Sequence, residues 1–315
     1  MFALVKQLKQ VGVLGINQRN CDFTLVYNQR KYYPLVDDKL QTKQLAQKAN
    51  IAIPALYAVI EFERQLSDLS KILENHADFV IKPGHGSGGN GIIVIIGKHK
   101  GMFRKSNGEL VDIKELRHHI SNVMSGIYSL GGQPDKALIE YRVKFAPVFE
   151  QISFQGIPDI RIVVFLGVPV MAMVRLPTHL SQGRANLHQG AIGAGIDIAT
   201  GKTLTAVLNN KIVNEHPDTG NDVTNVQVPN WDTLLRLASK CYDLTCLGYQ
   251  GIDIVLDKDL GPLILEINAR PGLNIQIANN AGLLPRLNAV KQTCTKLTNI
   301  EDRVRFAKQH FSVLH

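Results

Sequence analysis

The sequence predicts a protein of the α/β or α+β class, and two observations lead to that prediction. Segments with the helical spacing of apolar residues alternate with short apolar runs typical of strands along the 315 residues. The chain also contains no internal repeat and no low-complexity tract. A chain of this length can form one large domain or two ordinary ones with a sizeable core.

The first half of the chain contains three predicted helices, at 37–50, 64–76 and 111–126. Between the second and the third helix lie two apolar runs, DFVIKP (78–83) and GIIVIIG (91–97). Both runs have the length and composition of buried strands. We therefore expect a strand that ends at a lysine and a proline, followed after a short loop by a second strand.

The second half begins with a predicted strand at 137–143 and a hairpin at 159–176 that turns at LGVP. A helix at 231–248 then leads to two further strands, at 251–256 and 262–268. The connection between these two strands reads DKDLG, and its aspartate and glycine residues are typical of a tight turn. The last two strands are therefore expected to pair as a hairpin.

Composition and charge narrow the class of protein. With 45% hydrophobic and 20% charged residues, the chain resembles a globular protein rather than a disordered one. No apolar run reaches the roughly 18–20 residues of a membrane span, and the start of the chain lacks the pattern of a signal peptide. Four cysteines without a CxxC pair predict neither disulfides nor zinc, so a cytoplasmic location is expected. The net charge of +8 is consistent with an anionic ligand, but no RNA-binding motif accompanies it, and neither nucleic acid nor membrane is the expected partner.

A glycine-rich stretch, KPGHGSGGNG, follows the strand at 78–83. Five glycines between residues 84 and 91 leave backbone N–H groups unshielded, so the loop can wrap closely around phosphate oxygens. Lys82, just before it, adds a positive charge. The spacing matches neither a P-loop nor a dinucleotide fingerprint, and a flexible hairpin connection is an equally good interpretation of the loop.

Three oxygen donors lie on the predicted hairpin near the C-terminal end of the chain. Asp253 interrupts an apolar strand, and Glu266 and Asn268 lie two residues apart at the end of its partner, on one face. Mg²⁺ prefers carboxylate and amide oxygens together with water and nucleotide phosphates. The alternative is a salt bridge with Arg270 or another basic residue.

Three arginines lie at strand ends or in a loop of the middle region: Arg161, Arg175 and Arg184. The guanidinium fork binds two oxygens at once and therefore suits carboxylate or phosphate recognition. Each of them can equally be a surface charge. His188, in the same loop as Arg184, is either a general base or a structural residue.

Seven segments in order resemble the ATP-grasp superfamily and, within it, the α-L-glutamate ligases, which add glutamate to a ribosomal protein or to cofactors. The resemblance covers about residues 37–285. It is carried by the following segments: DDKLQTKQLAQKANIAIP, DFVIKPGHGSGGNG, IEYRV, DIRIVVFLGVPVMAMVR, GRANLHQGA, GIDIV and LEINARPGL.

The resemblance implies an ATP-grasp fold, with two lobes that each contain a β-sheet and helices and with the nucleotide held between them. The implied domains are an N-terminal lobe with the glycine loop at 37–140 and a C-terminal lobe with the metal site at 141–300. A short segment, 1–36, replaces the complete domain that usually precedes these lobes, and Arg19 and Asn20 are its candidate substrate residues. Outside the resemblance, EDRVRFAKQHF (301–311) has the pattern of a solvated amphipathic segment, and a C-terminal helix at 301–315 completes the expected order.

The resemblance also implies roles for individual residues. Lys39 and Lys82 would contact the ATP phosphates, while Glu140 and Tyr141 would lie against adenine, largely through backbone groups. The implied nucleotide-side set is completed by loop and strand-end residues: His85, Gly86, Ser87, Gly88, Gly89, Asp159, Arg184 and Asn186.

The implied metal ligands are Asp253, Glu266 and Asn268, which would bind one or two Mg²⁺ or Mn²⁺ ions. The implied catalytic residues are Arg161 and Arg175, which would face the transferred phosphoryl group or an acyl phosphate. Arg270 is a third candidate, and it stands where related ligases commonly have a small residue. It either binds a substrate carboxylate or pairs with Glu266.

The activity implied by the resemblance is ATP-dependent ligation of a carboxylate and an amine through an acyl phosphate. Glutamate or another amino acid would be joined to an acceptor, which is a small molecule, a peptide or a protein. Two alternatives stay open at this point. A kinase of the same fold would transfer the phosphoryl group to a hydroxyl, and a regulatory protein would bind nucleotide or RNA without turnover.

Overall fold

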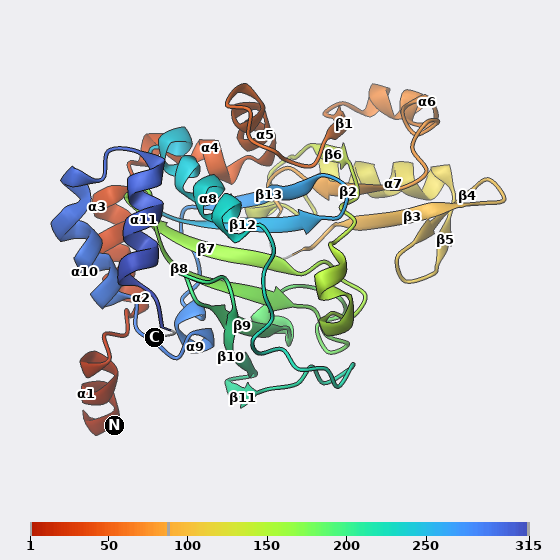
Figure 1. The fold of residues 1–315 in the computed structure, drawn as a ribbon. Coiled ribbons are helices and arrows are strands. Elements are labelled where there is room, and N and C mark those ends of the chain that lie inside the picture. Colours follow the sequence, from red (N-terminus) through yellow and green to blue (C-terminus); the bar gives the residue numbers. More distant parts are fainter. Residues whose placement is uncertain (1, 87–88, 314–315) are drawn as a thin grey trace. The chain divides into compact units, whose positions relative to one another are not determined.

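The structure, a computed structural model, describes residues 2–86 and 89–313. The chain divides into two compact units (Figure 1). The small unit consists of residues 38–44 and 53–143. The large unit consists of residues 1–37, 45–52 and 144–315. Helix α5 (Lys39–Lys48) begins in the small unit and ends in the large one.

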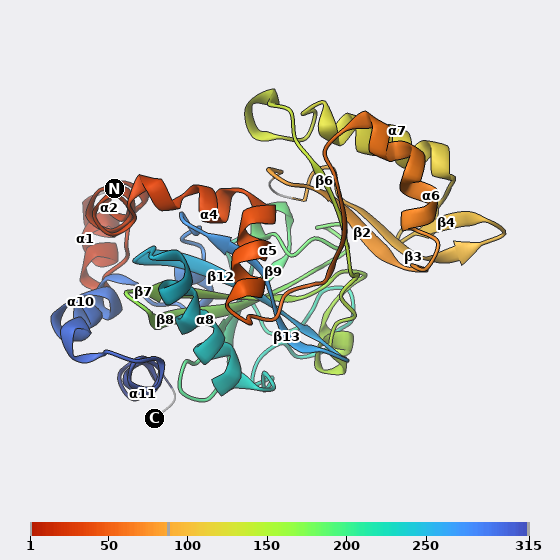
Figure 2. The same cartoon turned by 90° about the horizontal axis from the view of Figure 1, so that it is seen from above.

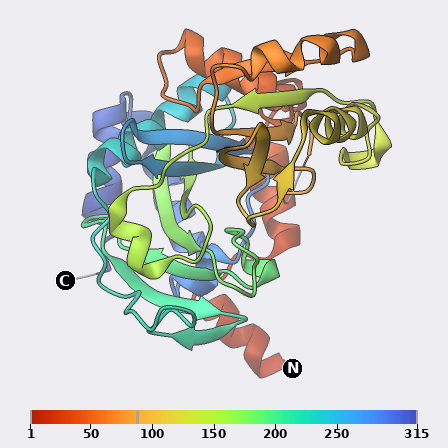
Figure 3. The ribbon, with the colours of Figure 1, turned by 90° about the vertical axis from the view of Figure 1, so that its right-hand side faces the viewer.

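The small unit is built on a six-stranded sheet in the order β1-β6-β2-β3-β4-β5, in which every neighbouring pair is antiparallel. Its strands are β1 (Leu56–Ile60), β2 (Phe79–Pro83), β3 (Ile93–His99), β4 (Met102–Lys105), β5 (Leu110–Val111) and β6 (Ala137–Glu140). Helix α7 (Ile113–Met124) packs against β2 and β6 (Figure 3). The predicted strands at 78–83 and 91–97 are confirmed as β2 and β3.

Helix α7 shows how the sequence determines this packing. Asp112 accepts a hydrogen bond from the Glu115 N–H at 2.8 Å, and its own N–H donates to the Glu115 carboxylate at 2.7 Å, which closes a capping box. Leu116 and Ile120 point into the core and are fully buried. The predicted helix at 111–126 is therefore confirmed. The predicted helix at 64–76 is instead a 3-10 helix (Glu63–Asp68) that continues into the short α6 (Leu69–Ile72).

The large unit is built on a seven-stranded antiparallel sheet in the order β11-β10-β9-β8-β7-β12-β13. Its strands are β7 (Asp159–Phe165), β8 (Val168–Leu176), β9 (Ile192–Ile196), β10 (Thr203–Leu208), β11 (Lys211–Val213), β12 (Tyr249–Asp257) and β13 (Gly261–Asn268). Both predicted hairpins are present, as β7–β8 and β12–β13. With one antiparallel sheet and helices in each unit, the predicted α+β class is confirmed.

Helices cover this sheet. Helix α8 (Trp231–Thr245) runs across β7 and β12 (Figure 2) and buries Leu234 and Leu235. The C-terminal helix α11 (Ile300–His310) packs on α8 and β8 and buries Phe306 and Ala307. It is amphipathic as expected, but its apolar face is packed against the unit and is not solvated. Two more helices, α9 (Ile275–Ala278) and α10 (Leu284–Thr293), follow β13. None of the described helices has both the length and the apolar character that a membrane span requires.

The N-terminal segment belongs to the large unit. It contains the helices α1 (Phe2–Gln10), α2 (Ile16–Gln18), α3 (Leu25–Tyr27) and α4 (Pro34–Asp37), with a π-helical stretch, Arg19–Thr24, between α2 and α3. Phe23 packs its ring edge-on against Phe165 of β7, with centroids 5.5 Å apart. The Asn28 amide donates to the carbonyls of Tyr249 at 2.6 Å and Ala269 at 3.0 Å. These contacts tie the segment to β7 and to the open end of the β12–β13 hairpin.

Candidate functional site

A buried cluster of two lysines and one carboxylate lies in the small unit. Lys82 is near the end of β2, Glu140 ends the neighbouring strand β6, and Lys43 comes from α5. The Glu140 carboxylate contacts the Lys82 Nζ at 2.5 Å and the Lys43 Nζ at 2.8 Å. Lys43 also donates to the Pro54 carbonyl at 2.8 Å. The cluster therefore places two positive charges beside one negative charge in a buried position.

The electrostatics of the cluster follow from its burial. Burial by itself raises the pKa of Glu140, but Lys82 and Lys43 together hold that pKa below its ordinary value. Burial and the neighbouring Lys82 lower the pKa of Lys43, and Glu140 opposes this effect. Because buried cations need anionic partners, these two lysines are suited to a second anion such as a phosphate. This is the observation on which a nucleotide site rests.

Lys43 is the residue that the sequence analysis missed. Lys39 had been predicted as the first phosphate-binding lysine, but the Lys39 Nζ donates to the Gly86 carbonyl at 2.6 Å. Its backbone N–H donates to the Gly84 carbonyl at 3.2 Å, so Lys39 ties the helix to the glycine loop. Lys43 lies one helical turn later, and only this i, i+4 spacing could have indicated it. The role of Lys39 at the phosphates stays a prediction.

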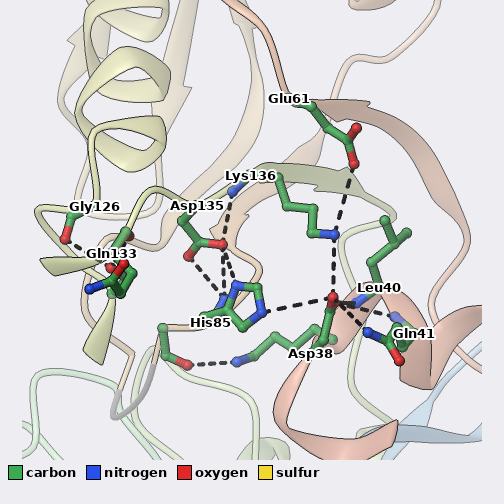
Figure 4. A network of polar contacts seen from close by, with 12 residues as sticks. Asp38, Leu40, Gln41, Glu61, His85, Gly126, Gln133, Asp135 and Lys136 are labelled. Carbon is green, nitrogen blue, oxygen red and sulfur yellow. Dashed lines mark hydrogen bonds and ion pairs between the residues drawn. The ribbon is translucent and has the colours of Figure 1, made fainter. Parts of the chain in front are cut away.

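The beginning of the glycine loop is held by a network of polar contacts (Figure 4). The ring Nδ1 of His85 lies 2.7 Å from Asp135 Oδ1, and the backbone N–H of His85 donates to Oδ2 of the same carboxylate at 2.9 Å. On its other side, His85 Nε2 lies 3.8 Å from Asp38 Oδ2, which also contacts the Lys136 Nζ at 3.2 Å. Gly84 donates to the Lys136 carbonyl at 2.9 Å. The His85 ring is therefore fixed between two carboxylates.

The predicted nucleotide residues of the small unit differ in how much of their role the structure describes. Gly86 forms a β-bridge with Ser129, and Gly89 has a φ of +80°, which favours glycine. Ser87 and Gly88 lie outside the described residues. Tyr141 donates its backbone N–H to the Ala55 carbonyl at 2.8 Å, as an extension of the β1–β6 pairing. The adenine contacts predicted for Glu140 and Tyr141 stay predictions.

A second charged cluster lies in the large unit, on three neighbouring strands. Arg161 of β7 makes a two-point contact with Asp253 of β12, with distances of 2.7 and 2.6 Å. Arg175 of β8 contacts both Asp159 oxygens at 2.5 Å and reaches Asp253 Oδ2 at 2.8 Å. These pairs follow from the register, which places Asp253 beside Arg161 and Asp159 beside Arg175. Two arginines and two aspartates thus balance each other.

The two buried aspartates respond differently because their charged neighbours differ. Burial raises the pKa of Asp253, but Arg161 and Arg175 lower it by more, so the net shift is downward. For Asp159, burial and the nearby Asp253 charge outweigh Arg175 and raise the pKa to about 6. The pKa of Arg175 is raised despite burial because both carboxylates favour its charged form. In this arrangement Arg161 and Arg175 are engaged by aspartates, and their contact with a phosphoryl group stays a prediction.

The three predicted metal ligands lie together on β12 and β13. Glu266 is the cross-strand partner of Asp253, and Asn268 is the partner of Gly251. The Asn268 amide nitrogen lies 3.3 Å from Asp253 Oδ2. Two carboxylates and one amide oxygen that lie side by side are oxygen ligands of the type that Mg²⁺ binds. Asp253, however, is already held by Arg161, so its place in the ligand set is the weakest of the three.

No group of three or more His, Cys, Asp or Glu side chains within 2–86 and 89–313 is arranged to hold a metal ion. The predicted set has only two carboxylates, because its third member, Asn268, is an asparagine, so it is not a group of this kind. Its metal role stays a prediction. Asp159 belongs to the arginine–aspartate cluster and does not extend the set.

The other predicted residues of the large unit lie on its surface. The Arg270 guanidinium lies 4.7 Å from the centroid of the Tyr33 ring. It forms no ion pair with any described residue, so the alternative of a pair with Glu266 is not observed. Arg184 is exposed, and the Asn186 side chain accepts a hydrogen bond from the His188 N–H at 3.0 Å. Asn186 thus caps a short 3-10 helix, and His188 is an exposed loop residue.

Comparison with known proteins gives one family match. The sequence pattern of the family described as sugar-transfer associated ATP-grasp matches residues 18–292. No curated protein matches the chain.

Solved structures with a similar fold include three ligases. The ATP-grasp ligase PsnB, complexed with minimal precursor, Mg and ADP, is 14% identical over 85% of this chain and 62% of its own, with a TM-score of 0.46. The D-alanine–D-alanine ligase from Bacillus anthracis complexed with ATP is 15% identical over 84% of this chain and 66% of its own, with a TM-score of 0.45. The VanG D-Ala:D-Ser ligase from Enterococcus faecalis is 13% identical over 84% of this chain and 63% of its own, with a TM-score of 0.48. The chain spans less than two thirds of the length of PsnB.

Proposed function

The chain belongs to the sugar-transfer associated ATP-grasp family, which confirms the predicted superfamily, and we propose that it is an ATP-dependent carboxylate–amine ligase. The observation that supports a nucleotide site best is the pair of buried lysines, Lys43 and Lys82, around Glu140. The α-L-glutamate ligase subtype stays a prediction. The family description adds sugar-linked acids and amino sugars to the candidate substrates.

The proposed reaction has two steps. A carboxylate oxygen of the acid attacks the γ-phosphorus of ATP, the bond from that phosphorus to the ADP oxygen breaks, and an acyl phosphate forms. An amine then attacks the acyl carbon, phosphate leaves, and the amine loses a proton to solvent. Phosphoryl transfer requires mainly positioning and charge stabilisation.

The residues of the chain would divide this work between them. Lys43 and Lys82 would bind phosphate oxygens of ATP, because each carries a buried positive charge. Glu266 and Asn268 would hold Mg²⁺, which neutralises phosphate charge when it is bound. Arg161 would stabilise charge near the acyl phosphate if binding of the ion draws Asp253 away from it.

Hydroxylamine tests this proposal without knowledge of the natural amine. It converts an acyl phosphate into a hydroxamate, so acids can be screened with Mg²⁺ and ATP while ADP and hydroxamate are both measured. We expect Lys82→Met and Lys43→Met to abolish hydroxamate formation. The matched control is Lys105→Met, which removes a half-buried lysine of the same unit that pairs with Glu109 and should leave hydroxamate formation unchanged.

Two results would change the assignment. ADP release in step with a phosphorylated product, with no hydroxamate, would favour a kinase of the same fold. Nucleotide binding that is equal in the wild type and in Lys82→Met would contradict the nucleotide site itself. Sugar acids and amino sugars belong in the screen beside amino acids and short acidic peptides.

A further inference from the structure

The turn that follows β13 is held rigidly from several directions. The guanidinium of Arg19 donates to the Pro271 carbonyl at 2.8 Å and to the Arg270 carbonyl at 3.3 Å. Asn28 donates to the Ala269 carbonyl at 3.0 Å. On the neighbouring strand β12, a Cβ atom at Gly251 would lie 2.6 Å from the Pro271 Cβ, so the turn sits directly against that backbone. The backbone of the turn is therefore fixed by contacts with the rest of the unit.

This rigid turn carries one exposed positive charge. The Arg270 side chain is exposed, and its guanidinium lies over the half-buried Tyr33 ring at 4.7 Å. The Tyr33 carbonyl accepts the N–H groups of Val36 and Asp37 at 3.0 and 2.9 Å, so the start of α4 fixes the position of this tyrosine. A cation held over an aromatic face keeps its N–H fork available for another partner.

The charge of Arg270 differs from that of three other arginines of this unit, Arg161, Arg175 and Arg19. Arg161 and Arg175 are bound to carboxylates, and Arg19 is buried with its donors on backbone and amide oxygens. Arg270 forms no ion pair within the part of the chain that the structure describes. It follows Asn268 by two residues, so the two Cα atoms lie at most about 7 Å apart. An anion bound to Arg270 would therefore lie close to the proposed metal ligands.

We propose that Arg270, oriented by Tyr33, binds a second carboxylate of the substrate acid, so that this acid is a short dicarboxylic acid. The inference rests on the proposed ligase function. One carboxylate of the acid would be phosphorylated beside Glu266 and Asn268, while the other is held by the Arg270 fork. We assign both carboxylates to one molecule because Asn268 and Arg270, the residues beside which they would lie, are only two positions apart in the chain.

Matched pairs of acids test this inference. Glutarate and valerate have the same carbon chain and differ in the second carboxylate, as do succinate and butyrate. With hydroxylamine as the trap, we expect the wild type to use the diacid with a kcat/KM about 10- to 100-fold higher, the effect of a charge-assisted hydrogen bond. Arg270→Gln should remove this preference through KM, with little change in kcat and in the rate with the monoacid.

Further variants separate recognition from folding. Arg270→Lys keeps the charge without the fork and should keep part of the preference, whereas Tyr33→Phe keeps the ring and should keep all of it. Arg236→Gln is the matched control, because Arg236 is an exposed arginine of the same unit that pairs with Glu301. Equal thermal stability of the wild type and Arg270→Gln would show that the fold is unchanged.

A binding measurement gives a second readout that does not need turnover. Titration calorimetry in the presence of Mg²⁺ and a non-hydrolysable ATP analogue should give tighter binding of glutarate than of valerate to the wild type but not to Arg270→Gln. Equal use and equal binding of diacids and monoacids by the wild type would overturn the inference and leave the ligase proposal standing. Absence of hydroxamate with every acid, together with absence of acid binding, would overturn both.

Discussion

Replacement of Glu140 by glutamine should destabilise the small unit strongly at neutral pH. The side chain of Glu140 is 4% exposed, and those of its two partners, Lys43 and Lys82, are both 7% exposed. Glutamine keeps the volume and one acceptor but removes the negative charge. Two ammonium groups are then left close together, without a charged partner and with little water.

The magnitude follows from the cost of an uncompensated buried charge. Removal of one partner of a buried ion pair typically costs about 3–5 kcal/mol. Glutamine still accepts one hydrogen bond, so we expect about 3 kcal/mol, at the lower end of that range. The pair Glu140→Gln with Lys43→Met should regain part of the loss, because the second change removes one of the two stranded cations.

The pH dependence gives an independent check with a defined sign. The two lysines hold the pKa of Glu140 below its ordinary value of 4.5. A depressed carboxylate pKa contributes stability that is present above the unfolded-state value and is lost as the pH falls through the folded-state value. The stability difference between the wild type and Glu140→Gln should therefore be full at pH 7 and shrink below pH 4.5.

The assay must report on the small unit. The chain has one tryptophan, Trp231, which lies in α8 of the large unit, so its fluorescence would follow the wrong part of the protein. Hydrogen exchange of the backbone amides of β2 and β6 measures the opening free energy locally. A loss below about 1 kcal/mol at pH 7, or a further loss when Lys43→Met is added, would refute this reasoning.

Three other changes have defined outcomes. Asn28→Ala should lower the free energy of unfolding by about 1–3 kcal/mol in urea denaturation, because buried backbone groups such as the Ala269 carbonyl lose a partner; a loss within error would contradict the anchoring role. Asp135→Asn should speed amide exchange at His85 several-fold, since the charged acceptor of its backbone N–H is removed, and unchanged exchange would show that the charge of Asp135 does not hold this N–H. Glu266→Gln should weaken Mn²⁺ binding in the presence of ATP about 10- to 100-fold by electron paramagnetic resonance, and equal affinity would remove this residue from the metal site.

The sequence predicted best those parts of the fold in which the period of apolar residues is unbroken. The β12–β13 hairpin was predicted because its strands are mostly apolar and the turn residues are distinctive. Once the two strands pair, the register places Asp253 beside Glu266. The alternation of side chains along a strand was enough to bring these two candidate residues together.

The contacts of the charged side chains could not be predicted in the same way. Lys43 lies on a helix of low apolar content, and its burial depends on the ends of β2 and β6, which are remote in sequence. The pairing of Arg175 with both Asp159 and Asp253 likewise requires three strands in register. Charged partners are chosen by tertiary packing, and no local pattern in the sequence encodes that choice.

The N-terminal segment acts on the candidate substrate site through the backbone. The family match begins at residue 18, directly before Arg19, whose buried guanidinium holds the carbonyls of Arg270 and Pro271. Asn28 holds the preceding carbonyl, and Tyr33 lies under the Arg270 side chain. Arg19 was expected to contribute to a substrate pocket, but its Nη1 donates to the carbonyls of the turn, and its Nε and Nη2 donate to the Asn20 side-chain oxygen. The segment therefore fixes the backbone of the turn that carries Arg270, which makes Arg19 and Asn28 positioning residues for the proposed carboxylate contact.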